Sequence, residues 1–484
     1  MLFNSYEFIL FFLPVCLFFY YYLLNKKFYK LSKVHLVCSS LFFYSWWNIH
    51  YLPLLLISIL FNFYINHQIT KKNLNHFQRK RILIFAIIVN ISLLAYFKYS
   101  DFFIANINLI FGLQLPLLDL VLPLAISFFT FQQIAYLIDS YSTERKENNF
   151  LNYTTFVTFF PQLIAGPIVY YKEMMPQFKN LKKTKKSNYI ALGLFLFSIG
   201  LFKKVIIADT FALWATSGFD KSSILTFFEA WATSLSYTFQ LYFDFSGYTD
   251  MAIGLALLFN INLPANFNSP YKATNIQDFW QRWHITLSRF LKDHIYIPLG
   301  GNRYGNYKTI NNILITFTIG GIWHGAGWTF IFWGLLHGLA LVVNRIWKSL
   351  GMILPIWLSW FLTFNFVNVA WIFFRSNNWE DAIKVLKGMV GLSGVILPSF
   401  LSEHLSFLGN YGVVFGGLIE NISDNKFIPL WIFFSFIFVL SFNNSMEIKK
   451  NFSMNYKTSI FAGITFVCSF LSINRVSEFL YFNF

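Results

Sequence analysis

Long apolar blocks recur along the whole chain, and short polar segments separate them. Blocks of this kind predict helices that span or enter a membrane. They lie near residues 6–24, 34–49, 51–66, 82–98, 118–139, 188–207, 224–242, 247–260, 309–322, 326–346, 354–375, 428–442 and 458–473. Several are shorter than the roughly 20 residues of a full span, so half-spans and re-entrant pieces are expected. The pattern predicts an all-α polytopic membrane protein with about eleven to thirteen transmembrane helices.

One apolar segment cannot form a straight helix. Residues 156–171, F-V-T-F-F-P-Q-L-I-A-G-P-I-V-Y-Y, contain Pro161, Gly166 and Pro167. Proline removes a backbone donor and clashes with the preceding turn, so it breaks a helix. Irregular backbone at membrane depth is tolerated only against protein or a water-filled cavity. We therefore expect a re-entrant segment that lines an inner chamber.

Residues 274–293 have the pattern of an amphipathic helix lying at the membrane surface. Thr274 and Gln277 fit a capping box at its start. Apolar side chains then recur on one side at helical spacing, and charged side chains recur on the other. The apolar set is Ile276, Trp280, Trp283, Leu287 and Leu291, and the charged set is Asp278, Arg282, Arg289 and Asp293. His284 lies near the apolar side, and Asp278 and Arg282 are spaced for an i,i+4 pair.

Composition agrees with a membrane protein, since 56% of the residues are hydrophobic and only 12% are charged. A soluble domain carries roughly 25% charged residues. We find no soluble domain and no internal repeat of the transporter kind, so we expect one membrane domain over 1–484, with a motif-bearing core at about 118–375. The three cysteines lie in apolar runs without CxxC spacing and imply no disulfide.

The net charge of +16 indicates membrane orientation and not nucleic-acid binding. Basic residues gather at cytoplasmic ends and attract anionic lipids. Clusters at Lys71–Arg81 and Lys182–Lys186, and a weaker one at Arg145–Lys146, mark cytoplasmic loops. The lysines that follow the first apolar block place the first loop inside and the N-terminus outside.

The stretch Gly320–Trp328, G-G-I-W-H-G-A-G-W, carries the strongest chemical signal. It sets His324 among small residues and tryptophans, and an intramembrane histidine is a candidate functional residue. The glycines allow backbone and substrate to approach the ring closely. His284, in the run Q-D-F-W-Q-R-W-H, is either a second site residue or a hydrogen-bonded core histidine. The same two interpretations apply to His337.

Two such histidines suggest proton transfer or acyl transfer within the bilayer. Neutral imidazole can take a proton from a hydroxyl and return it later. A metal site is disfavoured, because no H-E-x-x-H motif and no Cys/His ligand spacing occur.

Two carboxylates stand in the otherwise apolar run Q-L-Y-F-D-F-S-G-Y-T-D-M-A-I-G. They are Asp244 and Asp250, and intramembrane carboxylates are usually paired or functional. Arg282 is a candidate partner for them. Ser246 is not the nucleophile of a hydrolase elbow, because the G-x-S-x-G pattern is absent.

Several segments together carry a resemblance to a known family. These are M-L-F-N-S-Y-E-F-I-L-F-F-L-P at the start, L-P-L-A-I-S-F-F-T-F-Q-Q-I-A-Y-L-I-D (122–139), F-P-Q-L-I-A-G-P-I (160–168), F-D-F-S-G-Y-T-D-M-A-I-G (243–254), N-F-N-S-P-Y (266–271), F-W-Q-R-W-H-I-T-L-S (279–288), G-G-I-W-H-G-A-G-W (320–328) and W-I-F-F-R (371–375). With them the chain resembles the membrane-bound O-acyltransferases, and most closely their bacterial polysaccharide O-acetylation branch.

The resemblance implies a ring of transmembrane helices around a thinned centre, with a catalytic funnel. His324 matches the family's catalytic histidine, and His284 matches a second histidine typical of the family. Around them we expect supporting or substrate-binding side chains: Trp323, Trp328, Trp280, Trp283, Arg282, Gln281, Asp244, Ser246 and His337.

The resemblance also implies a reaction. An acetyl group would pass from a cytoplasmic thioester, acetyl-CoA, across the membrane for O-acetylation of a cell-envelope polysaccharide such as peptidoglycan or an alginate-like polymer. A periplasmic or extracellular transferase of the SGNH type would complete the transfer. We expect no permanently bound cofactor and a place in the cell's inner membrane, among its lipids.

Three alternatives remain open at the level of sequence. Within the same family, the chain would move D-alanine to teichoic acid from a carrier-protein thioester. A proton-coupled transporter would use the histidines as a relay, although the scarcity of intramembrane charge argues against it. A membrane scaffold for an envelope-modifying complex would not need His324 at all.

Overall fold

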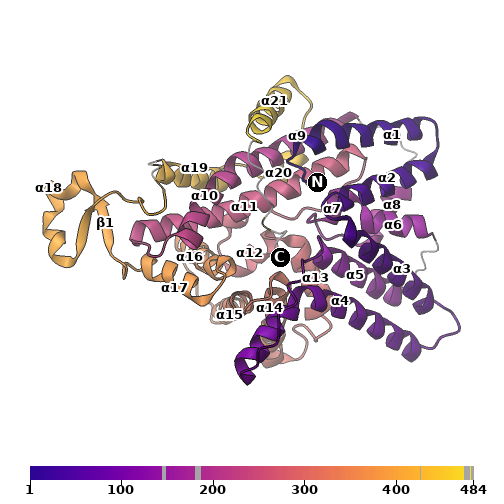
Figure 1. Ribbon diagram of the computed structural model, residues 1–484, viewed down its shortest axis with the longest axis horizontal. Helices are drawn as coiled ribbons and strands as arrows, with labels where there is room; N and C mark the ends of the chain where they lie inside the picture. Colours follow the sequence, from indigo (N-terminus) through magenta and orange to yellow (C-terminus); the bar gives the residue numbers. More distant parts are fainter. Residues whose placement is uncertain (144–148, 180–186, 424, 426, 474–479, 481–484) are drawn as a thin grey trace. The chain divides into compact units, whose positions relative to one another are not determined.

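The computed structural model describes residues 1–143, 149–179, 187–423, 425, 427–473 and 480, and almost all of its regular structure is helical (Figure 1). The predicted cytoplasmic markers Arg145–Lys146 and Lys182–Lys186 lie outside these residues. Among the described residues, strands occur only as β1 (Val395–Pro398) and β2 (Val413–Gly416), which pair in parallel. The predicted all-α class is confirmed.

The chain divides into two compact units. The first comprises Met1–Phe202, Gly247–Ala265 and Lys449–Phe484, and the second comprises Lys203–Ser246 and Asn266–Ile448. Helices of the first are η1 (Glu7–Phe12), α1 (Leu13–Asn25), α2 (Tyr29–Ser45), η2 (Ile49–Tyr51), α3 (Leu52–Ile69), α4 (His76–Phe111), α5 (Ile126–Thr143), α6 (Phe150–Thr158), α7 (Phe160–Leu163), α8 (Tyr171–Lys179), α9 (Ser187–Phe202) and α21 (Tyr456–Leu471).

The second unit holds the remaining elements apart from two that contribute to both. Its helices are η3 (Lys203–Ala208), α10 (Asp209–Thr216), η4 (Ser217–Lys221), η5 (Pro270–Lys272), α12 (Ile276–Arg282), α13 (Ile285–Leu291), η6 (Lys292–Tyr296), α14 (Gly305–His324), α15 (Trp328–Ser349), α16 (Ile356–Arg375), α17 (Trp379–Met389), η7 (Ser399–Leu401), α18 (Ser402–Leu405), η8 (Ser406–Tyr411) and α19 (Ile428–Ser441). Helices α11 (Phe227–Leu258) and α20 (Ser445–Lys450) contribute residues to both units.

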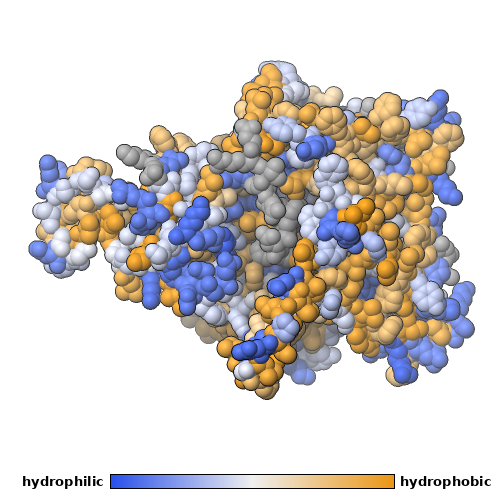
Figure 2. Space-filling view, in the orientation of Figure 1, coloured by the Kyte–Doolittle hydropathy of each residue, from blue (hydrophilic) through white to orange (hydrophobic). Residues whose placement is uncertain are grey.

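Six helical stretches of the described chain are long and apolar enough to cross a membrane. They are Glu7–Asn25, Ile49–Ile69, His76–Phe111, Ser187–Lys221, Trp328–Ser349 and Ile356–Arg375, and α19 and α21 are shorter apolar helices. Apolar side chains cover much of the face shown in Figure 2. Phe11 and Phe18, on the first stretch, are exposed. The protein is therefore a multi-pass membrane protein, while the number of eleven to thirteen spans stays a prediction.

The apolar blocks locate the long apolar helices, although block 118–139 begins before α5 does and two blocks belong to one helix. Blocks 224–242 and 247–260 were expected as two helices, but α11 runs through both without interruption. Gly247 does not break the helix, and its backbone lies against Gly200 of α9. A Cβ on Gly200 would lie 2.5 Å from the Gly247 carbonyl oxygen. The glycine thus serves close helix packing and not a turn.

A second glycine pair repeats this contact one heptad away. A Cβ on Gly193 would lie 2.7 Å from the Gly254 carbonyl oxygen, and a Cβ on Gly254 would lie 2.6 Å from the Gly193 carbonyl oxygen. Small residues at such spacing let two helix backbones approach, which is how helices associate where lipid removes the hydrophobic driving force. Helices α9 and α11 are joined by this glycine seam.

The broken segment at 156–171 is confirmed. Helix α6 ends at Thr158, the short α7 follows, and an irregular stretch leads to α8. Residues 152–170 are all buried, so the irregular backbone lies against protein as the membrane argument requires. Side chains hold this stretch in place. The Gln162 side-chain amide donates to the Phe156 carbonyl at 2.7 Å, and the Phe160 N–H donates to the Ser40 hydroxyl at 3.1 Å.

The glycine seam predicts a sharp difference between two Gly→Ala substitutions. Gly254→Ala inserts a methyl group against the Gly193 carbonyl, and overpacking of this kind costs about 1–3 kcal/mol. Gly463→Ala on α21 is the matched control, because a Cβ there meets nothing within 4 Å. We expect a lower thermal midpoint in detergent for Gly254→Ala alone, measured by size-exclusion chromatography after heating. Equal midpoints for the two variants would refute the seam.

Candidate active site

His324 is the last residue of α14, and it lies in a box of aromatic rings from three helices. The ring centroid of Trp323 lies 4.8 Å from that of His324, and those of Trp333 on α15 and Phe374 on α16 each lie 5.0 Å away. His324 is only 2% exposed. The structure thus places this imidazole in a buried site at the C-terminus of α14.

The glycines of the G-G-I-W-H-G-A-G-W segment bring α14 and α15 together. A Cβ on Gly321 would lie 2.4 Å from the Phe330 carbonyl oxygen, and Gly321 and Gly334 approach each other backbone to backbone. A Cβ on Gly325 would enter the Phe330 ring. These glycines thus allow a close approach of two helices, while the predicted approach of substrate to the His324 ring stays a prediction.

The prediction of a single amphipathic helix over residues 274–293 is wrong. The segment forms α12 and α13, and between them His284 adopts a left-handed conformation with φ of 42°. Backbone pairing with a distant segment explains the break, because Ile285 donates to the Asn266 carbonyl and Asn268 donates to the Arg282 carbonyl, each at 2.9 Å. These bonds pull the backbone out of the helical path.

Of two local features predicted for this segment, the capping box is wrong and the ion pair is confirmed. The N-cap is Asn275, whose side chain accepts from the Asp278 N–H at 3.0 Å, so the capping box assigned to Thr274 is wrong. The i,i+4 pair of Asp278 and Arg282 is confirmed at 2.7 Å. Apolar side chains of both helices are buried, so the segment belongs to the interior of its unit and not to an open surface.

Asn266 holds His284 in a defined state. The Asn266 Oδ1 accepts from the Thr286 N–H at 3.2 Å and from the Thr286 hydroxyl at 2.9 Å, so it is an acceptor. The His284 Nδ1, 3.1 Å away, must then donate to it. Burial lowers the pKa of His284 to about 3, so the ring is neutral near pH 7, with the hydrogen on Nδ1 and an acceptor lone pair on Nε2.

Trp323 stands between the two predicted site histidines. Its ring centroid lies 4.8 Å from that of His324 and 6.2 Å from that of His284. The rings of Phe245, on α11, and His284 pack edge to face, and their centroids lie 4.7 Å apart. The structure therefore brings His284 and His324 to one aromatic cluster, although about forty residues separate them in the chain.

His337 joins the same cluster from α15. The Trp280 indole N–H donates to the His337 Nδ1 at 3.2 Å, which leaves Nε2 to carry the ring hydrogen. The His337 ring lies 4.8 Å from Trp333, which itself lies 5.0 Å from His324. A continuous path of rings thus leads from Trp280 to His324.

The predicted carboxylate Asp244 has a partner that sequence reasoning missed. Its Oδ1 lies 2.6 Å from Nζ of Lys204, and Lys204 also lies 3.0 Å from Asp209. Lys204 and Asp244 are both almost fully buried. The proposed pairing of Asp244 with Arg282 is wrong, since Arg282 pairs with Asp278 on its own helix and the buried carboxylate is compensated by Lys204.

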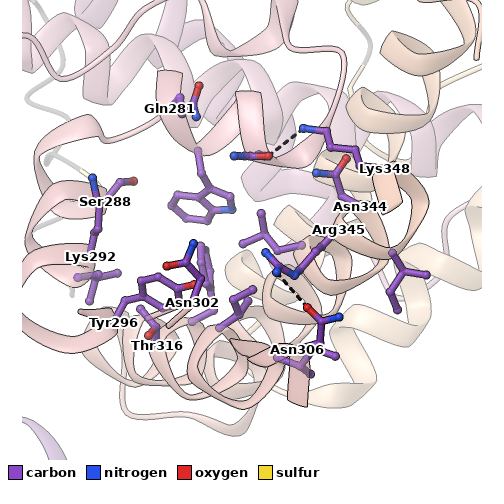
Figure 3. A pocket seen from close by; sticks show the side chains of 18 of the residues that line it. Gln281, Ser288, Lys292, Tyr296, Asn302, Asn306, Thr316, Asn344, Arg345 and Lys348 are labelled. Atoms are coloured by element: carbon purple, nitrogen blue, oxygen red, sulfur yellow. Dashed lines mark hydrogen bonds between the residues drawn. The ribbon is translucent and has the colours of Figure 1, made fainter. Parts of the chain in front are cut away.

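The other predicted residues are spread over several environments. Trp283 is buried against Trp371, with ring centroids 4.9 Å apart, and Ser246 is buried on α11. Gln281 is exposed and lines a cavity (Figure 3), while Trp328 is 54% exposed at the start of α15. Within the described ranges, no group of three or more His, Cys, Asp or Glu side chains is placed to hold a metal ion.

Asn266 and Lys204 are the residues that sequence reasoning missed. Asn266 opens the N-F-N-S-P-Y segment, which was noted as a motif without a role. Lys204 follows Lys203 inside an apolar run. A cation within an apolar segment was therefore the only sequence signal that this residue has a role. Chemically, the assembled cluster offers buried imidazoles that can exchange protons in a site shielded from water.

Comparison of the sequence with known proteins shows the family of this chain. Residues 1–378 match the sequence model of MBOAT, the membrane-bound O-acyltransferase family. The chain is 50% identical to the peptidoglycan O-acetyltransferase of Helicobacter pylori, an alignment that covers all of this chain and 98% of that protein.

Two further relatives show how far the likeness extends. The probable alginate O-acetylase AlgI of Pseudomonas aeruginosa is 39% identical over 80% of this chain and 75% of its own length. The teichoic acid D-alanyltransferase of Streptococcus thermophilus is 28% identical over 46% of this chain and 57% of its own length. The chain is an acyltransferase and belongs to the membrane-bound O-acyltransferase family.

Proposed function

We propose that this protein is a membrane O-acetyltransferase that moves acetyl groups from a cytoplasmic thioester for O-acetylation of a cell-envelope polysaccharide. The observation that carries the proposal is the buried imidazole of His324 in its aromatic box, within a chain of this family. Peptidoglycan is the acceptor that the comparisons favour, since that likeness is 50% and spans the whole chain. An alginate-like polymer is the second choice.

In the proposed reaction His324 acts as the general base. It takes the proton of an acceptor hydroxyl, and the oxygen attacks the carbonyl carbon of the acetyl thioester. The carbon–sulfur bond then breaks, and the imidazolium returns the proton to the leaving thiolate. The products are an acetyl ester and a free thiol. A two-step variant, in which the imidazole carries the acetyl group transiently, uses the same residue.

His284 is proposed as the orienting or proton-relaying partner. Its neutral ring keeps an acceptor lone pair on Nε2, because Asn266 holds the hydrogen on Nδ1. This division of the two ring nitrogens is what a relay or an orienting contact requires. The remaining cluster residues, Trp280, Trp323 and His337, would shape the site and exclude water.

The positions of basic residues support a proposal for the direction of transfer. Arg345 and Lys348 stand near the end of α15, and Arg345 contacts Asn306 at the start of α14. Basic residues mark cytoplasmic ends, so His324, at the other end of α14, would lie toward the outside. We propose acetyl-CoA as the donor, the inner membrane as the location, and an outward N-terminus.

The acceptor step would involve a second protein. A transferase of the SGNH type on the outer side would take the acetyl group and pass it to the polysaccharide. D-Alanyl transfer remains the weaker candidate, because the likeness to the D-alanyltransferase covers less than half of this chain.

His324→Ala should abolish O-acetylation without unfolding the protein, since it removes a group that acts only in the transition state. The loss of a general base lowers turnover by about 10²–10⁴-fold. Acetyl groups on purified peptidoglycan and exopolysaccharide would be measured by mass spectrometry in cells with the wild type, the variant or no copy. His404→Ala is the control, because His404 is exposed on α18. Full acetylation by a normally expressed His324→Ala protein contradicts the proposal.

Asn266→Ala should lower turnover more than it raises KM, because His284 loses the acceptor that sets its tautomer. Asn266→Asp keeps an acceptor oxygen at this place, and we expect it to restore part of the turnover. The measurement is the rate of acetyl transfer in membranes, with KM for the donor determined in parallel. If the Ala and Asp variants lose activity equally while both fold, Asn266 does not act through His284.

A further inference from the structure

Trp333, on α15, carries a buried hydrogen-bond donor. Its side chain is 1% exposed, and its indole Nε1 has no hydrogen-bond partner among the residues that the structure describes. An indole nitrogen donates and cannot accept. The neighbouring Trp280 shows the usual arrangement, because its N–H donates to the His337 Nδ1 at 3.2 Å. Buried polar groups in native proteins are nearly always paired, so the orphaned Trp333 N–H needs an explanation such as a catalytic role.

The Trp333 ring is held in a fixed orientation beside the candidate base. It stands perpendicular to the His324 imidazole, with ring centroids 5.0 Å apart and planes at 89°. It stacks on Trp371 at 5.6 Å, and the Phe374 ring lies 4.9 Å away. The next residue, Gly334, meets α14 backbone to backbone, which holds this part of α15 against the helix that carries His324. The donor is therefore preorganised next to the base and does not have to reorient during a reaction.

Acyl transfer develops negative charge on the carbonyl oxygen of the donor. As the acceptor oxygen attacks the carbonyl carbon, the carbon–oxygen π electrons move onto the carbonyl oxygen, and His324 takes the hydroxyl proton. The oxyanion then re-forms the carbonyl while the carbon–sulfur bond breaks, and the imidazolium returns the proton to the thiolate. A fixed donor aimed at this oxyanion, in a site shielded from water, is usually the largest single contribution to such a reaction.

We propose that the Trp333 indole N–H donates a hydrogen bond to this oxyanion. This role rests on the proposed function of His324, and it deepens that function by naming the group that stabilises the intermediate. Reacting atoms approach to about 3–3.5 Å, and a donor stands about 2.7–3.1 Å from the oxyanion. A base and a donor that serve one carbonyl therefore lie several ångströms apart, which the 5.0 Å separation of the two ring centroids allows.

An isosteric replacement separates the N–H from the ring. Trp333 of the full-length protein would be replaced by β-(3-benzothienyl)alanine, which keeps the shape of tryptophan and has sulfur in place of the N–H. For acetyl transfer from acetyl-CoA in membranes, we expect kcat to fall by about 10²–10³-fold, the effect of removing one oxyanion donor. KM should stay the same, because the contact forms only in the transition state. The pH profile of kcat/KM should not move, since the base is unchanged.

Thermal stability gives a second readout with a matched control. Removal of an unpaired buried donor removes its desolvation cost, so the thermal midpoint of the Trp333 replacement should stay the same or rise. The same replacement at Trp231 is the control, because the Trp231 N–H donates to the Met389 carbonyl at 3.1 Å. At Trp231 the thermal midpoint should fall, and kcat should stay unchanged.

Three results would each overturn the role of Trp333. They are a kcat equal to that of the wild type, a lower thermal midpoint, which would make the N–H a structural donor, and a shifted pH profile, which would mean that Trp333 acts by tuning His324. A wild-type protein that transfers no acetyl group from acetyl-CoA would instead contradict the proposed function. The thermal midpoint is read without acetyl transfer, so it tests Trp333 in that case as well.

Discussion

Contact between helix backbones at paired glycines is the interaction on which the rest of this structure depends. In lipid, apolar side chains gain little by leaving the bilayer, so helices associate through close van der Waals contact. Gly193 with Gly254 joins α9 to α11, and Gly321 with Gly334 joins α14 to α15. The second contact also builds the site, because Trp333 stands beside Gly334 and so reaches His324 at the end of α14.

A second constraint is that polar groups in a dry interior must find partners within the protein. This explains why the segment around His284 leaves the helical path, since the Asn266 backbone and side chain supply bonds that a continuous helix could not use. The same requirement accounts for the contact between Lys204 and Asp244, two buried charges that would be costly alone. The polar features that look functional in the sequence are therefore also structural supports.

These two constraints together produce an interior suited to acyl transfer. His324 is almost completely shielded from water by rings from three helices, which would protect a thioester from hydrolysis. Trp280 is hydrogen-bonded to His337, which packs against Trp333 of the His324 box.

The sequence by itself determined the class of protein and the main candidate residue, because both depend on local composition. Apolar blocks located the long apolar helices, and the glycines and tryptophans around His324 marked it as a special position in an apolar region. Only the tertiary structure decided that α11 is one helix, that α12 and α13 are two, and that Asn266 and Lys204 support the site. Each of these outcomes depends on contacts between segments that are distant in the chain, such as Gly200 with Gly247 or Asn266 with Ile285, and such contacts leave no periodic signal in the sequence.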